Sequence, residues 1–209
     1  MESIAQKKKR AGAILRRLKK AYPDAGIVLN YKTPMQLLVA VILSAQATDK
    51  QVNSLTEELF KKYKTVNDFA SANLQAFTKE VANVNFYKNK AKYIIGSAKK
   101  IRDEYGGKLP SDIDEMVKLP GVARKTANIV LHEVYGVVQG IAVDTHVIRV
   151  SRNLGLTKEK NPVKIEQDLM KLYPKNRWPD VEFLFQAYGR TAMPARGKPK
   201  MDDPLVGLY

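Results

Sequence analysis

Apolar residues recur along most of this chain with the i, i+3, i+4, i+7 spacing of an amphipathic helix. The clearest case places Ala127, Val130, Leu131 and Val134 on one face of a predicted helix over residues 124–135. The same reasoning predicts helices over residues 4–21, 34–44, 49–63, 66–72, 74–82, 88–105, 162–173 and 181–188, with the second of them almost wholly apolar and therefore buried. We expect an all-α fold.

Residues that begin and end helices agree with this pattern. Gly136 is placed to stop the helix over residues 124–135, and Asp144 to cap a helix that runs to residue 153. Ser111 or Asp112 is expected to cap a short helix ending near residue 118. Strand signals are confined to two brief apolar stretches within residues 137–143.

The composition points to a polyanionic partner. Lys and Arg outnumber Asp and Glu by 36 to 21, a formal charge of +15, which favours nucleic acid or an anionic membrane face. No apolar run approaches the roughly 20 residues needed to span a bilayer, and the N-terminus lacks a signal-peptide core. We therefore expect an intracellular protein that faces nucleic acid and does not span a membrane.

The absence of cysteine removes several classes of site. Without thiols the chain can form no disulfide, hold no iron–sulfur cluster through thiolates and build no cysteine-based zinc site. His132 and His146 are the two histidines, and neither has acidic residues at ligand spacing. No metal site is expected.

A turn at residues 119–123 leads directly into the predicted helix that begins at Arg124. Pro120 fixes its own φ, and Gly121 can adopt backbone angles that other residues avoid. Such a turn offers the free N–H groups of a helix N-terminus to an anion such as phosphate. A bound phosphate would bring Lys125 close to a sugar.

Lys125 is a candidate nucleophile, although most lysines are simply solvated surface groups. An amine nucleophile must be neutral part of the time, a state favoured by cationic neighbours and partial burial. Arg124 and the helix N-terminus supply positive potential beside it. An amine so placed can attack an anomeric carbon, form a Schiff base and permit β-elimination of the 3′ phosphate.

Asp144 has two interpretations that are compatible with each other. It follows the apolar run Ile141-Ala142-Val143, where it can act as a helix N-cap and nothing more. A carboxylate there can also stabilise a developing oxocarbenium ion or help to deprotonate the lysine. Capping would hold such a carboxylate rigidly.

Three blocks, in the same order, resemble the endonuclease III family of helix-hairpin-helix DNA glycosylases. They are LPGVARKTANIVL followed by IAVDTHVIRVSRNLGL, LSAQATD at residues 43–49, and FYKNKA at residues 86–91. The resemblance implies two helical lobes with a DNA-binding cleft between them. One lobe is a helical barrel with the hairpin, residues 22–136, and the other combines residues 1–21 with 137–209.

The resemblance also implies roles for individual residues. The family's Schiff-base lysine corresponds to Lys125 and its carboxylate to Asp144. Gln46 matches the residue that fills the gap left by an extruded nucleotide, and Phe86 lies where the family has an apolar wedge, although it could also be a core aromatic. The resemblance also implies that the backbone N–H groups of Gly121, Val122 and Ala123 in the hairpin contact DNA, and Arg124 is a further expected contact. Relatives often bind a monovalent cation at this hairpin.

Two features depart from the family pattern. Ala123 stands where the family usually has a second glycine, and it would weaken the hairpin if a positive φ is needed there. Most relatives also end with four cysteines around a [4Fe–4S] cluster, whereas this chain has none. We expect apolar packing to replace the cluster, contributed by Met193, Leu205, Val206, Leu208 and Tyr209.

These features together predict a DNA repair enzyme that works as a monomer without a cofactor. The resemblance implies a glycosylase and β-lyase acting on oxidised pyrimidines or abasic sites in duplex DNA. A monofunctional mismatch or uracil glycosylase is the nearest alternative, and a non-catalytic DNA-binding protein is another. A pure binding protein would need neither Lys125 nor Asp144.

Overall fold

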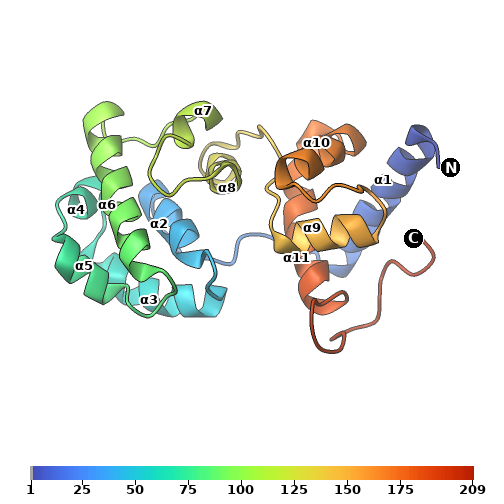
Figure 1. Ribbon diagram of the computed structural model, residues 1–209, viewed down its shortest axis with the longest axis horizontal. Coiled ribbons are helices and arrows are strands. Elements are labelled where there is room, and N and C mark those ends of the chain that lie inside the picture. The colour runs from blue at the N-terminus through green and yellow to red at the C-terminus, as the bar shows by residue number, and fades with distance from the viewer. Residues whose placement is uncertain (1) are drawn as a thin grey trace. The chain divides into compact units, whose positions relative to one another are not determined.

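The computed structural model describes residues 2–209, and these form eleven α-helices, one 3-10 helix and no strand (Figure 1). The prediction of an all-α fold is confirmed. The two stretches within residues 137–143 that gave strand signals are irregular backbone.

The described residues divide into two compact units. Val28–Val137 form the middle unit, and residues 2–27 with Val138–Tyr209 form the terminal unit. The middle unit contains α2 (Pro34–Ser44), α3 (Asp49–Lys62), α4 (Val66–Ala70), α5 (Leu74–Glu80), α6 (Tyr87–Glu104), α7 (Ile113–Met116) and α8 (Arg124–Tyr135). The terminal unit contains α1 (Ile4–Ala21), α9 (Thr145–Asn153), α10 (Pro162–Leu172), η1 (Lys175–Arg177) and α11 (Trp178–Thr191).

Most helices begin and end close to the predicted residues because the local signals are strong. Asp112 caps α7, and Gly136 ends α8 in a left-handed conformation with φ +63°. The main difference is α11, which was predicted over residues 181–188 but begins three residues earlier. Pro179 is accommodated in its first turn, where the missing N–H costs nothing.

The core of the middle unit surrounds α2. Nine of its eleven residues are buried, and it packs against α3, α6 and α8. At one end of this core Tyr63 stacks on Phe69 with ring centroids 5.3 Å apart, and Phe77 meets Tyr63 edge-on at 5.2 Å. A helix that is apolar all round is stable only inside such a cage of other helices.

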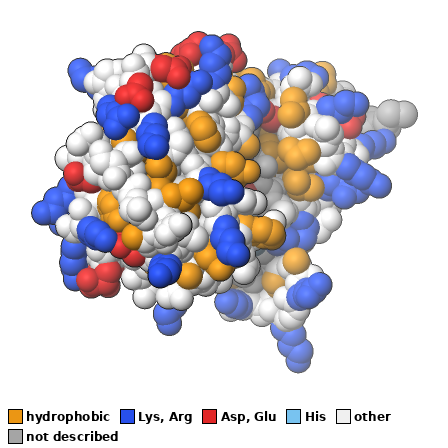
Figure 2. All heavy atoms as spheres, turned by 60° about the vertical axis from the view of Figure 1, so that its left-hand side comes forward, with side chains coloured by type: hydrophobic (Ala, Val, Ile, Leu, Met, Phe, Trp, Pro, Cys, Tyr) orange, Lys and Arg blue, Asp and Glu red, His pale blue; other side chains and the backbone are white. Residues whose placement is uncertain are grey.

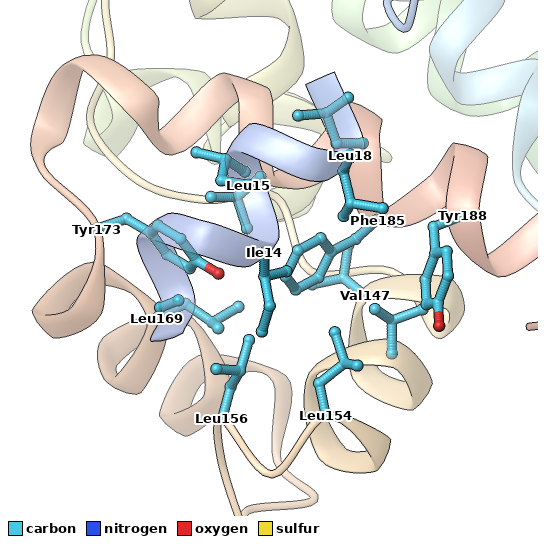
Figure 3. Close-up of a cluster of buried hydrophobic side chains, with 14 of the residues drawn as sticks. Ile14, Leu15, Leu18, Val147, Leu154, Leu156, Leu169, Tyr173, Phe185 and Tyr188 are labelled. Carbon is cyan, nitrogen blue, oxygen red and sulfur yellow. The ribbon is translucent and has the colours of Figure 1, made fainter. Parts of the chain in front are cut away.

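The terminal unit joins the two ends of the described chain in one core. Ile14 and Leu18 of α1 lie against Phe185 of α11, with Val147 of α9 and Leu169 of α10 completing the cluster (Figure 3). All five side chains are fully buried. The core of the terminal unit is therefore completed by α1, which is far in sequence from α9, α10 and α11.

Basic side chains outnumber acidic ones, 36 to 21. Figure 2 shows Lys and Arg spread over the face it presents, with Asp and Glu gathered in smaller groups. Within the part of the chain that the structure covers, no helix is both long and apolar enough to cross a membrane.

Candidate active site

The turn before α8 is fixed by its contacts with α6. Gly121 has φ +75°, and a Cβ added there would lie 2.7 Å from the Cβ of Tyr93. The hydroxyl of Ser97 donates to the carbonyl of Pro120 at 2.7 Å, and the side chain of Leu119 is buried. The absence of a side chain at residue 121 therefore allows the turn to sit directly on α6.

The turn offers two of the three N–H groups that were predicted to bind phosphate. The N–H of Val122 already donates to the carbonyl of Leu119 at 3.1 Å, and its side chain is buried, so the prediction that its N–H is offered to phosphate is wrong. The N–H groups of Gly121 and Ala123 have no acceptor among residues 2–209. Unpaired N–H groups in a turn before a helix are groups that can attract an anion.

Ala123 is the N-cap residue of α8 and has an ordinary backbone conformation. Its φ of −83° and ψ of 166° are in the extended region, so the glycine of relatives is not needed for a positive φ. Its methyl group makes no capping hydrogen bond, and the first turn of α8 contains no acidic residue. Residue 123 therefore supplies no side-chain cap to α8.

Lys125 lies in the first turn of α8, at the second helical position. The side chain is half-buried and makes no hydrogen bond or ion pair within the described part of the chain. Its neighbour Arg124 is exposed. The amine of Lys125 therefore lies beside a helix N-terminus that has no side-chain cap.

Asp144 caps α9 as predicted. Its Oδ1 accepts from the N–H groups of His146 and Val147, both at 2.8 Å. Its Oδ2 accepts no hydrogen bond from any residue that the structure describes. The carboxylate is therefore held through Oδ1 alone within the described residues.

His146 is kept neutral by its surroundings. Burial lowers its pKa, and Arg149 and Arg190 act in the same direction, whereas Asp144 opposes them. Arg149 donates to the carbonyl of Gly189 at 2.7 Å and lies 3.2 Å from His146 Nδ1. The first turn of α9, which Asp144 caps, is therefore held against α11 through Arg149.

Gln46 and Phe86 share an unusual backbone conformation. They are the only non-glycine residues with positive φ among residues 2–209, at +54° and +58°. Phe86 precedes α6 and is 60% exposed, so the alternative that it is a core aromatic is wrong. Gln46 is also exposed, in the turn between α2 and α3.

The structure places the candidate residues in both units. Gln46, Phe86 and the segment 121–125 belong to the middle unit, whereas Asp144 belongs to the terminal unit. Within the middle unit the loops of Gln46 and Phe86 are joined, because the Asn85 side chain donates to the carbonyl of Gln46 at 2.9 Å. No local pattern in the sequence predicted that link.

In the C-terminal segment, Asp203 binds two tyrosines. Its Oδ1 accepts from the Tyr188 hydroxyl at 2.9 Å and from the N–H of Leu205 at 2.8 Å, and its Oδ2 accepts from the Tyr209 hydroxyl. The guanidinium of Arg17 also donates to the carbonyl of Val206 at 2.9 Å. Polar contacts therefore attach the segment to α11 and α1.

The apolar packing predicted for this segment is only partly present. Leu205 is buried, and Met193 and Leu208 pack partly buried against the core. Val206 and Tyr209 are 71% and 59% exposed, so the prediction that they pack is wrong. Their exposed positions follow from the hydrogen bonds of Asp203 and Arg17, which hold the segment through its polar atoms.

The residues of this segment do not fit an iron–sulfur cluster. Such a cluster needs thiolates, and the chain contains none. Within residues 2–209 no three His, Asp or Glu side chains come together as a metal site.

A family model and curated relatives match this chain over most of its length. Residues 39–175 match the model described as HhH-GPD superfamily base excision DNA repair protein. Endonuclease III of Synechocystis sp. is 46% identical over 196 residues, which cover 94% of this chain and 90% of the relative. Endonuclease III of Bacillus subtilis is 42% identical over 188 residues, 90% of this chain and 85% of the relative.

Solved structures agree with these matches. A trapped endonuclease III–DNA covalent intermediate superimposes with a TM-score of 0.87 at 39% identity, covering 91% of this chain and 90% of the other. A thermostable thymine-DNA glycosylase shares the fold with a TM-score of 0.80 at 20% identity, covering 92% of this chain and 91% of the other.

Proposed function

The chain belongs to the HhH-GPD superfamily of base excision DNA repair proteins and, within it, to the endonuclease III family, and we propose that Lys125 and Asp144 perform its chemistry. The enzyme is a DNA glycosylase with AP lyase activity, acting on oxidised pyrimidines. The observation that carries the assignment of Lys125 is its position, without a partner, beside the uncapped N-terminus of α8.

The first step is recognition of the DNA backbone. The N–H groups of Gly121 and Ala123 bind a phosphate, and Arg124 adds positive charge. A monovalent cation held by the backbone of residues 119–123 would add further positive charge there. Phe86 enters the base stack as a wedge, and Gln46 occupies the space left by the extruded nucleotide. Extrusion costs a few kcal/mol and costs least for a damaged base. The wedge and the gap-filling residue therefore extrude a damaged nucleotide more easily than an intact one.

The second step removes the base. The neutral amine of Lys125 attacks C1′ of the sugar, the bond between C1′ and the base breaks, and the base leaves with a proton. The carboxylate of Asp144, fixed through Oδ1 by two N–H groups, has Oδ2 free to stabilise positive charge at C1′ or to accept the proton of the lysine.

The third step cleaves the strand. The C1′–O4′ bond of the sugar opens as O4′ takes the proton from the lysine nitrogen, which leaves a Schiff base between Lys125 and C1′. The Schiff base acidifies the C2′ hydrogen, and loss of that proton expels the 3′ phosphate by β-elimination. Water then hydrolyses the Schiff base and regenerates the amine. No step requires a cofactor. We propose a monomer that acts on damaged or abasic duplex DNA inside the cell.

Borohydride trapping tests this proposal. Duplexes that contain thymine glycol, dihydrouracil or an abasic site are incubated with the enzyme and reductant, and a covalent complex is expected. Lys125→Ala should abolish the complex, whereas Lys99→Ala, which removes an exposed lysine from α6, should not. Base release without a trapped complex would indicate a monofunctional glycosylase, and DNA binding alone would indicate a non-catalytic protein.

A further inference from the structure

The backbone of Gln46 and of Phe86 is held in a conformation that neither residue prefers. A non-glycine residue in the left-handed region is strained and persists only when its surroundings impose it. Phe86 is also an unusual N-cap, since N-cap residues normally have an extended backbone and a polar side chain. Contacts around the two loops must therefore impose both conformations.

Lys90 provides the strongest of these contacts. It lies in the first turn of α6, four residues after Phe86, and its side chain is only 4% exposed. Its ammonium donates to the carbonyls of Leu43 at 2.8 Å and Ala45 at 2.6 Å, where α2 ends. A cation at a helix C-terminus satisfies carbonyls that the helix leaves unpaired and interacts favourably with its dipole.

The same residue is connected to Phe86 through the backbone. The N–H groups of Asn89 and Lys90 both donate to the carbonyl of Phe86 at 3.0 Å. Lys90 therefore contacts the Phe86 loop with its main chain and the start of the Gln46 loop with its side chain. Burial lowers the pKa of the ammonium, so these two carbonyls must offset a real desolvation cost.

Two exposed side chains join the loops a second time. Asn85 donates to the carbonyl of Gln46 at 2.9 Å, and Gln51 of α3 donates to the carbonyl of Asn83. The Phe86 loop thus supplies a donor and an acceptor, and their partners lie in the Gln46 loop and at the start of α3.

We propose that Lys90 is a positioning residue that fixes the Gln46 and Phe86 loops as one rigid unit before DNA binds. This inference rests on the proposed function, in which Phe86 enters the base stack and Gln46 fills the gap behind it. Both acts concern one nucleotide, so the two side chains must keep a constant separation. A rigid pair makes extrusion a single event with no further loop ordering.

Lys90→Met tests the role of the ammonium, because methionine has a similar shape but donates no hydrogen bond. Lys99→Met removes the same charge from an exposed position of the same helix and is the matched control. Asn85→Ala is a second variant that cuts the link between the loops at the surface, without a buried change. Thermal unfolding followed by circular dichroism verifies that each variant is folded.

The readout separates extrusion from chemistry. The lyase reaction is measured on an abasic site in two substrates, a duplex and a single strand. In the single strand no nucleotide has to be extruded from a stacked duplex. Fluorescence of 2-aminopurine opposite the duplex site reports unstacking. A displacement of about 1 Å can reduce a reaction rate by about 100-fold. Lys90→Met should therefore lower the lyase rate on the duplex 10- to 100-fold and delay the fluorescence rise. Asn85→Ala should have the same two effects, but smaller.

The single-stranded rate should change less than about threefold in every variant, because the geometry of Lys125 does not depend on the two loops. Wild-type duplex rates and fluorescence in both Lys90→Met and Asn85→Ala would overturn the inference. Equal losses on duplex and single strand would also overturn it, since they would indicate a general structural role. Failure of the proposed function is distinguishable, because the wild-type enzyme would then show no lyase reaction on either substrate.

Discussion

Replacing Asp144 separates its structural role from its chemical role. Asparagine can accept the same two hydrogen bonds through its amide oxygen, because it is as good an N-cap as aspartate. Asp144→Asn should therefore change the free energy of unfolding by less than about 0.5 kcal/mol. Asp144→Ala removes both bonds and should lose about 1 kcal/mol, or roughly 2–4 °C in Tm for a chain of this size.

The effect on catalysis should differ from the effect on stability. Both variants lose the negative charge, so both should remove the base about 100-fold or more slowly, the scale measured when a single electrostatic contact to a transition state is deleted. Affinity for an abasic-site duplex should change little in Asp144→Asn. Single-turnover base release from a thymine glycol duplex measures the rate, and urea denaturation measures the stability.

A matched control is available at another helix. Asp112 caps α7 in the same way, accepting from the N–H groups of Asp114 at 2.8 Å and Glu115 at 3.3 Å. Asp112→Asn removes an equivalent charge from an equivalent cap and should leave the rate of base release unchanged. If Asp144→Asn releases the base at the wild-type rate, Asp144 is only a cap and the chemical assignment is wrong.

Four further outcomes are expected. Gly121→Ala should cost about 2–4 kcal/mol in urea denaturation, from its positive φ and from the contact with Tyr93, and Tyr93→Ala should restore part of this; purely additive losses would contradict the clash. Asp203→Ala should cost about 1–3 kcal/mol by leaving the Tyr188 hydroxyl without its acceptor, and an unchanged melting temperature would refute that. Burial lowers the pKa of His146 in the folded state, so below about pH 7 the unfolded chain binds more protons than the folded chain. The free energy of unfolding should therefore decrease as the pH falls, and the decrease should be smaller in His146→Gln. Binding to an abasic duplex should weaken steeply with added salt, in proportion to the phosphates contacted.

The helices and the hairpin could be predicted because their signals are local. The spacing of apolar residues, the caps Asp112 and Asp144 and the stop at Gly136 each act within a few residues. Lys125 was found through its position in a short motif. Each of these signals lies within one continuous segment, so it can be recognised without knowing the fold.

The rest depends on contacts between distant segments. Lys90 is one of many lysines on an amphipathic helix, and only the end of α2, 45 and 47 residues away, gives it acceptors. The left-handed backbone of Gln46 has no signal at all in the sequence. Asp203 lies in an irregular segment, where nothing local predicted that it would bind tyrosines on both sides.

The contacts of Asp203 affect how the enzyme depends on its environment. An iron–sulfur cluster needs supplied iron and thiolate ligands. Here a carboxylate and the hydroxyls of Tyr188 and Tyr209 hold the C-terminal segment, and none of these groups is reduced or oxidised under ordinary conditions. These hydrogen bonds attach the C-terminal segment to α11 without iron and without thiolates, so reagents that remove iron or modify thiols should leave the attachment unchanged.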